Sequence, residues 1–418
     1  MRFIHTSDWH LGQTLHHFER GAEHQHFLDW LINTLEIEQA EGLLICGDIF
    51  DNANPSAASQ KQLYRFLQQA RQRIPHLNII LIAGNHDSPG RLEAPAPLLA
   101  SMDASVTGFV PRHADGSIDI ARLVVPLKNR AGEIAAWCLA VPFLRPGDVP
   151  RIEDEGEGKG DADPYMAGIA LLYRQVLDHA LTLRQPGQAI IALGHCHMIG
   201  GDVSEDSERR IVIGGTEALS AGIFDPAIAY AALGHLHLAQ RVAKQDHLRY
   251  CGSPLPMSFA EIGYPHQVLR VDLDGERVAA ITALPIPRAV DLLRIPKQPA
   301  PLADVLVALA ALDLPATDDL QQMPYLEVRV LLDAPEPGLR ATIEAALAGK
   351  PVRLARIDTS MAASTAVGAP ALSVDELDRL QPEDIFNRLY RSKYDTDTPA
   401  PLQAAFAELL LGAAGESA

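Results

Sequence analysis

Histidine, carboxylate and amide side chains recur in five short segments of this 418-residue chain, each directly after an apolar run. The segments are Asp8-Trp9-His10, Gly47-Asp48, Gly84-Asn85-His86-Asp87, Gly194-His195 and Gly234-His235-Leu236-His237. Imidazole, carboxylate and amide oxygen suit divalent ions such as Mn²⁺, Fe²⁺ or Zn²⁺, and the lack of thiolate argues against a structural zinc. The pattern therefore predicts a metal centre.

The number of ligands favours two ions rather than one. Asp8 and His10 are two positions apart, so an extended backbone points both side chains to one face, and the same holds for His235 and His237. Two ions ~3.5–4 Å apart stabilise the attacking and leaving oxygens of a phosphoryl displacement. The candidate ligands, sharing a bridging carboxylate, are Asp8, His10, Asp48, Asn85, His195, His235 and His237.

Each segment alone has a simpler explanation. Gly, Asn and Asp favour turns, so an isolated Gly-Asn-His-Asp is more often a turn than a site. His197 is a second candidate beside His195, because the local sequence GHCH mimics GHLH, although a loop histidine is the simpler interpretation. Five segments in this order, each after a strand, favour the metal centre.

Alternating strands and helices must position these residues. The carboxyl ends of strands in an open α/β sheet meet at one crevice, so ligands distant in sequence can converge there. An alternating pattern over Leu123–Pro126 and Ile134–Val141 predicts a second, more antiparallel sheet. Apolar runs predict strands at Arg2–Thr6, Gly42–Cys46, Asn78–Ala83, Ala189–Leu193 and Ile228–Leu233, and helical spacing predicts helices at His26–Glu38, Ser56–Arg73 and Met166–Leu183.

Composition shifts divide the chain into three expected domains, 1–285, 288–360 and 372–418. Five prolines in Leu284–Pro301 predict a linker or a domain boundary there. The middle domain is expected to be a small α/β unit. Its predicted elements are helices at Leu302–Leu312 and Gly338–Ala348 and strands at Tyr325–Leu332 and Val352–Ile357.

Composition also limits the protein's class. No apolar run reaches the ~18–20 residues of a membrane span, and the N-terminus has no apolar signal region, so no membrane association is expected. Four cysteines without a CxxC pair fit a reducing cytoplasm. The net charge of −18 argues against nucleic acid, but bound ions reverse local charge, which weakens that argument.

The five segments, SDWHLG, GDIFD, GNHDS, GHCH and GHLH, resemble those of the calcineurin-like two-metal phosphoesterases. Longer stretches resemble the SbcD family, the nuclease subunits of bacterial SbcCD complexes. These stretches are MRFIHTSDWHLG, CGDIFDNANPS, LIAGNHDSPGRLE, and YAALGHLH followed by YCGSPLPMSFAE. The resemblance is strong over about residues 1–285 and extends to the rest by layout only.

The resemblance implies a layered α/β metallophosphoesterase fold, in which helices flank two mixed sheets, with a small α/β capping domain and C-terminal helices. By position, Asp8, His10 and His237 match ligands of a first metal, and Asp48 matches the bridging carboxylate. Asn85, His195 and His235 match ligands of a second metal. His86 matches a catalytic residue that acts on the phosphate and leaving group. The family favours Mn²⁺.

The implied function is metal-dependent hydrolysis of DNA phosphodiesters, as a double-strand exonuclease and a single-strand or hairpin endonuclease in DNA repair, recombination and replication. The implied partners are DNA and an SbcC-like coiled-coil ATPase, with a homodimer inside a heterotetramer. Two alternatives stay open: a stand-alone phosphatase acting on a small phosphoester, and a non-catalytic scaffold subunit.

Two apolar stripes are candidate contact surfaces. The first is expected to form the homodimer contact, with the alternative that its helices only cover the sheet. It comprises Leu63, Phe66, Leu67, Leu92, Leu98 and Leu99. The second is expected to bind the ATPase, with the alternative that it folds back on the small domain. It comprises Leu377, Leu380, Ile385, Leu389, Phe406, Leu409 and Leu410.

Overall fold

Two units, Met1–Val290 and Asp291–Ala418, make up the chain. The structure is a computed structural model, and it describes residues 1–100, 102–150, 163–202, 218–361, 382–394, 396–399, 401–403 and 405–406. Within these ranges no helix is both long and apolar enough to span a bilayer.

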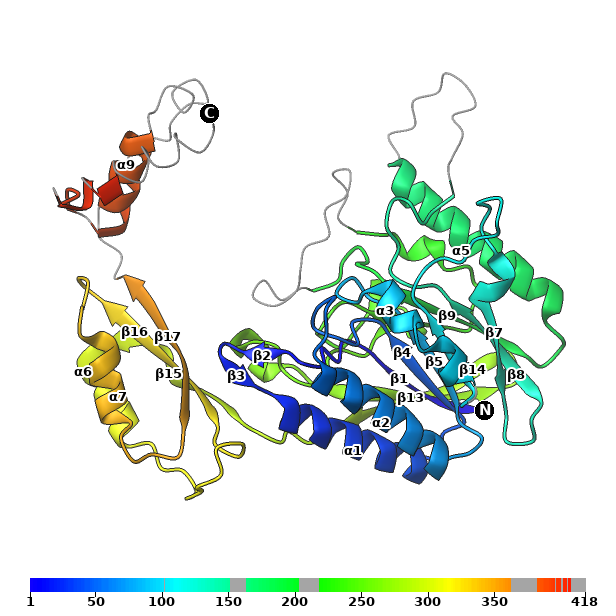
Figure 1. The fold of residues 1–418 in the computed structure, drawn as a ribbon, viewed down its shortest axis with the longest axis horizontal. Coiled ribbons are helices and arrows are strands. Elements are labelled where there is room, and N and C mark those ends of the chain that lie inside the picture. Colours follow the sequence, from blue (N-terminus) through cyan, green and yellow to red (C-terminus); the bar gives the residue numbers. More distant parts are fainter. Residues whose placement is uncertain are drawn as a thin grey trace. The chain divides into compact units, whose positions relative to one another are not determined.

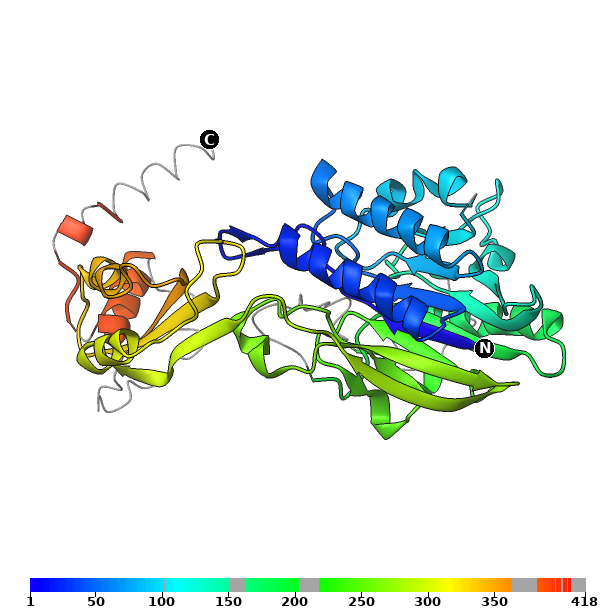
Figure 2. The same ribbon diagram turned by 90° about the horizontal axis from the view of Figure 1, so that it is seen from below.

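The first six-stranded sheet of Met1–Val290 has a parallel centre. β1, β4, β5 and β6 are parallel neighbours, while β13 pairs antiparallel with β1 and continues into the hairpin strand β14 (Figure 2). Strand β1 therefore lies between β4 and β13. Across the sheet the order is β14 (Arg277–Pro285), β13 (Gln267–Asp274), β1 (Arg2–Thr6), β4 (Gly42–Cys46), β5 (Asn78–Ile82) and β6 (Ala104–Thr107).

The second six-stranded sheet is also parallel at its centre. Its order is β11 (Gln240–Arg241), β12 (Leu248–Tyr250), β10 (Tyr230–Gly234), β9 (Ala189–His195), β8 (Ile134–Ala140) and β7 (Val124–Lys128). Only the outer pairs β7–β8 and β11–β12 are antiparallel. The prediction of a more antiparallel sheet is wrong, because the alternating pattern belongs to one outer pair. The fully buried strands β9 and β10 have the continuous apolar pattern of parallel strands.

Helices cover the outer faces of the two packed sheets. α1 (Gly21–Ile37) and α2 (Ala57–Arg73) lie side by side over the first sheet, and α5 (Pro164–Leu183) packs on the second (Figure 1). Short elements complete the unit: the hairpin β2 (Thr14–Leu15) and β3 (Phe18–Glu19), helices α3 (Pro89–Glu93) and α4 (Ala96–Ala100), and single 3₁₀ turns at Ile120–Leu123, Ala221–Ile223, Val242–Lys244 and Phe259–Gly263. The layer order is helix, sheet, sheet, helix.

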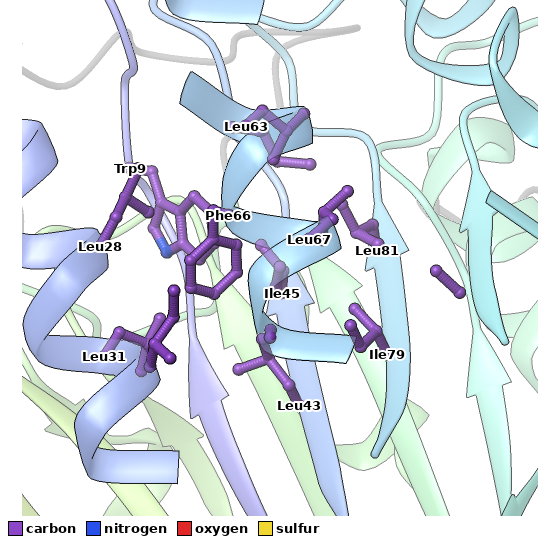
Figure 3. Packing of buried hydrophobic residues seen from close by; sticks show 14 of the residues in the cluster. Trp9, Leu28, Leu31, Leu43, Ile45, Leu63, Phe66, Leu67, Ile79 and Leu81 are labelled. Atoms are coloured by element: carbon purple, nitrogen blue, oxygen red, sulfur yellow. The ribbon is translucent and has the colours of Figure 1, made fainter. Parts of the chain in front are cut away.

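Successive side chains of the central strands point to opposite faces of the sheet, and this alternation produces the layers. In β4, Leu43 and Ile45 pack beneath the helices, whereas Leu44 and Cys46 face the second sheet. Beneath α1 and α2 the core contains Trp9, which is fully buried (Figure 3). α2 begins where predicted because Ser56 caps it, accepting a 3.1 Å hydrogen bond from the Ser59 N–H.

The apolar stripe expected to form a dimer contact is buried within the chain. Leu63, Phe66 and Leu67 pack against the first sheet (Figure 3). Leu92 and Leu99 are also buried. The sixth stripe residue is exposed; Leu98 has 70% of its surface accessible. The stripe as an exposed dimer surface is therefore a wrong prediction, because these helices use it to cover the sheet.

The unit Asp291–Ala418 contains a parallel three-stranded sheet. Its strands are β15 (Leu292–Pro301), β16 (Tyr325–Leu332) and β17 (Arg353–Met361), in that order, and α6 (Leu302–Ala310) and α7 (Leu339–Ala346) pack on it. The predicted linker at Leu284–Pro301 is wrong in part, because residues 292–301 form β15. Prolines are tolerated there because β15 is an edge strand and because Pro296 and Pro299 lie in its register shift between Ile295 and Ala300.

The C-terminal part is described only in pieces. Helix α9 (Pro382–Tyr394) carries Phe386, whose ring stacks on that of Phe406 at 4.1 Å between centroids. Leu389 of the predicted stripe is 64% exposed. Leu377, Leu380, Leu409 and Leu410 lie outside the described residues.

Candidate metal centre

The five predicted segments lie at the carboxyl ends of β1, β4, β5, β9 and β10, and Gly194-His195 are the last two residues of β9. Backbone hydrogen bonds join the first two, from Asp8 N–H to Gly47 O and from His10 N–H to Asp48 O, both at 3.0 Å. Four candidate ligands have the left-handed backbone that non-glycine residues rarely adopt, with φ of 54° at Asp8, 45° at His10, 47° at Asp48 and 104° at His235. Such clustered strain is typical of functional sites.

Close packing explains why glycine precedes the ligands. A Cβ at Gly47 would lie 2.2 Å from His195 Nδ1, and a Cβ at Gly234 would lie 1.9 Å from the Cys46 carbonyl oxygen. Gly47 also has a φ of +85°. These glycines let strands from the two sheets approach closely enough for their ligands to meet.

Three overlapping groups of potential ligand atoms result, each with its atoms within 4.8 Å of one another. They are Asp8–His10–His237, His10–Asp48–His86 and Asp48–His195–His235. Asp48 is shared by the last two groups, as a residue between two ions must be. Asn85 joins the third group, because its Oδ1 is 2.9 Å from His195 Nε2 and 3.2 Å from His235 Nδ1.

All seven predicted ligands and His86 thus lie in one place. His197 belongs to none of the three groups, and its ring centre lies 6.2 Å from that of His235.

A cation fits the third group because acceptor atoms converge there. His195 Nδ1 must donate its proton to the Cys46 carbonyl 2.9 Å away, so in the neutral ring Nε2 carries a lone pair. That lone pair faces Asn85 Oδ1 and lies 3.4 Å from Asp48 Oδ2. Three acceptors facing one another repel unless a proton or a metal ion lies between them.

The first group, Asp8–His10–His237, also has a buried atom that a cation would satisfy. His10 Nε2 is buried and has no hydrogen-bond partner among the described residues. Its distance to Asp48 Oδ2 is 3.7 Å, longer than a hydrogen bond. A buried ring nitrogen without a partner is costly in a protein, and a bound ion would satisfy it. The two groups therefore fit divalent ions.

The protonation behaviour of the site agrees with this fit. Burial lowers the pKa of His195, but the nearby Asp48 carboxylate outweighs burial and raises it to about 9, so positive charge is favoured there. Burial acts to raise the pKa of Asp48, yet the charge and hydrogen bond of His195 hold it well below its usual range. Burial and the charge of His195 hold the pKa of His235 well below its usual range, which leaves its ring neutral and able to bind metal.

His86 lies at the edge of this constellation. Its backbone N–H donates to Asp48 Oδ1 at 2.8 Å, and its Nδ1 donates to the Asp51 carbonyl at 2.7 Å. The ring is therefore held with Nε2 4.0 Å from Asp48 Oδ2. Its side chain keeps 10% of its surface exposed, more than the 3% of Asp48.

Sequence reasoning assigned no role to Glu261, which contacts the site through His237. Glu261 Oε1 is 2.9 Å from His237 Nδ1, and both side chains are buried. Because a carboxylate only accepts, Nδ1 carries the proton and the lone pair of the neutral ring is on Nε2, the arrangement usual for a carboxylate behind a metal-binding histidine. The sequence signal was the glutamate in SFAE, which lies on a 3₁₀ turn beyond the last segment.

Asp87, in the third segment, supports the site through its carboxylate. Its carboxylate accepts backbone N–H groups from Ile49 at 3.1 Å, Phe50 at 2.9 Å and Gly84 at 2.9 Å. It therefore joins the turn that carries Asp48 to the turn that carries Asn85 and His86. Burial and the charge of Asp48 raise the pKa of Asp87 to about 6.

Sequence comparisons relate both parts of the chain to known families. Residues 1–239 match the calcineurin-like phosphoesterase family, and residues 288–394 match the type 5 capsule protein repressor C-terminal domain. The chain is 40% identical to the SbcD subunit of nuclease SbcCD from Rhodobacter capsulatus over 92% of this chain and 93% of that one. It is 32% identical to the SbcD subunit of nuclease SbcCD from Escherichia coli K12 over 100% and 99%. A dimetal phosphatase from Danio rerio overlaps 69% of this chain and 99% of its own at 12% identity, with a TM-score of 0.35.

Proposed function

The chain belongs to the calcineurin-like phosphoesterases and to the SbcD family of SbcCD nuclease subunits, and from this premise we propose that it hydrolyses DNA phosphodiesters as the nuclease subunit of a complex with an SbcC-like ATPase. It would act as a double-strand exonuclease and a single-strand or hairpin endonuclease in DNA repair, recombination and replication. The observation that carries the proposal is that Asp48 groups with His10 on one side and with His195 and His235 on the other.

We assign one ion to Asp8, His10 and His237 and the other to Asn85, His195 and His235, with Asp48 between them. Nitrogen and oxygen ligands without thiolate are compatible with Mn²⁺, our proposed metal. When bound, such ions supply Lewis-acid chemistry that neutralises charge on the phosphate oxygens.

His86 is the proposed catalytic side chain. Since its Nδ1 donates to the Asp51 carbonyl, we assign the contact with a substrate phosphate to Nε2. The protonated ring would donate a hydrogen bond from Nε2 to the phosphate and pass that proton to the leaving oxygen. Asp48 fixes the backbone of His86 and so sets the position of the ring.

Assembly is proposed from the division of the chain. We retain a nuclease domain at 1–285, a small capping domain at 288–360 and C-terminal helices at 372–418, which would bind the coiled coil of the ATPase. A homodimer within a heterotetramer remains our proposal, although the buried stripe gives it no support. Cytoplasmic location is proposed because all four cysteines are free thiols.

A stand-alone phosphatase is not favoured, because the similarity to nuclease subunits extends over nearly the whole chain. The test is cleavage of end-labelled duplex and hairpin DNA with Mn²⁺, with and without the ATPase, using Asp48→Asn as the inactive control. We expect shortening of duplex ends and opening of hairpins. Hydrolysis of a small phosphodiester without any DNA cleavage would overturn the proposal.

A further inference from the structure

A buried hydrogen-bonded chain connects the segment after the first metal motif to the last metal motif. Arg20 has only 1% of its surface exposed, and its guanidinium holds both carboxylate oxygens of Glu23, at 3.0 Å from Nε and 2.8 Å from Nη2. This pairing satisfies two sides of the guanidinium and leaves Nη1 to make contacts elsewhere.

Nη1 of Arg20 contacts a segment that lies late in the sequence of the unit Met1–Val290. It donates to the Pro256 carbonyl at 2.6 Å and to Gln13 Oε1 at 3.0 Å, and Gln13 Nε2 in turn donates to the Met257 carbonyl at 3.1 Å. Two consecutive carbonyls are therefore fixed by side chains more than 230 positions earlier in the sequence.

The fixed segment holds Glu261. The Met257 N–H donates to Glu261 Oε2 at 2.7 Å, while Oε1 accepts from His237 Nδ1. Both carboxylate oxygens are thereby committed, one to the segment that Arg20 fixes and one to the metal ligand. Glu261 has no exposed surface, so water cannot replace either contact readily.

We propose that Gln13, Arg20 and Glu261 are positioning residues that set the ring orientation and tautomer of His237 toward one of the two ions. This inference rests on the proposed metal site. It predicts that perturbing these three residues weakens the binding of one ion and spares the other. The hydrogen bond that orients His195 goes to the Cys46 carbonyl, and none of the contacts of His195, His235 or Asn85 described above involves Gln13, Arg20 or Glu261.

Glu261→Gln tests the end of the chain. An amide offers one acceptor where two donors arrive, so either Met257 N–H or His237 Nδ1–H meets an amide nitrogen. In the second case His237 must move its proton to Nε2, which then cannot bind metal. We expect one of two Mn²⁺ affinities to fall about 10–100-fold, as is usual for partners of metal-binding histidines. The matched control is Glu327→Gln, a buried glutamate paired with Arg294 in the other unit.

Gln13→Ala tests the middle of the chain with a half-buried residue. We expect a fall of about tenfold in the same Mn²⁺ affinity. Its control is Gln188→Ala, which removes a half-buried glutamine that accepts from Trp137 Nε1 and donates to the Ile134 carbonyl at 2.9 Å.

Titration calorimetry of the full-length metal-free protein with Mn²⁺ gives both affinities without nucleic acid, so the result is independent of the DNA activity. Nitrogen chemical shifts of ¹⁵N-labelled histidines give the tautomer of His237, which general loosening would leave unchanged. The proposal would be overturned if Glu261→Gln bound both Mn²⁺ ions with wild-type affinity, or if it bound both ions equally more weakly. It would also be overturned if the control variants lost the same Mn²⁺ affinity.

Discussion

Phe66→Ala tests whether the core beneath the helices supports the metal centre. Phe66 is 2% exposed, and its ring meets Trp9 edge to face, with centroids 5.3 Å apart. Removing ~150 Å² of buried aromatic surface at ~25 cal/mol/Å² costs about 4 kcal/mol, within the ~3–5 kcal/mol usual for this substitution. Loss of the aromatic pair adds about 1 kcal/mol. We expect the free energy of unfolding to fall by about 5 kcal/mol.

The link to the metal centre is Trp9. It lies between Asp8 and His10, and its Nε1 donates to Thr6 Oγ1 at 2.8 Å. A cavity next to its ring would let the Asp8–His10 turn relax, and both residues have unfavourable backbone angles. The variant should therefore gain less stability from saturating Mn²⁺ than the wild type does, because ligand stabilisation depends on affinity for the folded state.

Phe224→Ala is the matched control. Phe224 is 6% exposed and meets Tyr173 edge to face at 5.2 Å, in the core beneath α5. The assay is urea unfolding followed by tryptophan fluorescence, with and without Mn²⁺. All three tryptophans, Trp9, Trp30 and Trp137, lie in Met1–Val290, so the transition reports that unit.

The reasoning would be refuted if Mn²⁺ raised the free energy of unfolding equally in Phe66→Ala and Phe224→Ala. A cost below ~2 kcal/mol for Phe66→Ala would refute the estimate.

Four further outcomes are expected. His86→Ala should keep two metal equivalents per chain by plasma emission and lose phosphodiester hydrolysis; loss of one equivalent would make His86 a ligand. Burial lowers the pKa of His5 to about 3, so the unfolded state takes up the proton first as pH falls below ~6.5, and stability is lost toward acid. Between pH 7.5 and 5 this amounts to ~2 kcal/mol, and His5→Gln should lack that part of the dependence in urea titrations. A chain ending at Met361, where β17 ends, should keep small-phosphodiester hydrolysis and no longer co-purify with the ATPase; continued co-purification would contradict docking by the C-terminal helices. Light scattering at micromolar concentration should give a dimer mass, and a monomer mass would exclude the homodimer.

Buried apolar runs made several elements predictable. β1, β4 and β16 have the predicted bounds, because short apolar runs bounded by turn residues have the length of a strand and are too short for a helix. The candidate site was predictable for a related reason. Each ligand lies at the carboxyl end of such a strand or within a few residues of it, so the strand pattern locates the ligand.

Features that depend on neighbours in space were not predictable. The stripe of α2 has the same sequence pattern whether it faces a partner or its own sheet, and only the folded structure shows Phe66 against Trp9. The strand β15 was hidden by prolines that are harmless only at an edge or a register shift. Glu261 was missed because its contact with His237 spans 24 positions and follows no spacing rule.

The position of β1 between β4 and β13 has a consequence for synthesis on the ribosome. β1 ends at Thr6 and its partner β13 ends at Asp274, 268 residues later. At ~5–20 residues per second, the N-terminal strand waits roughly 13–54 s for that partner. During translation one edge of β1 stays open to pairing with other chains, and Asp8 and His10 are made long before His237. The nascent chain therefore needs protection at its beginning, and a metal ion can bind all of its ligands only when the nuclease unit is nearly complete.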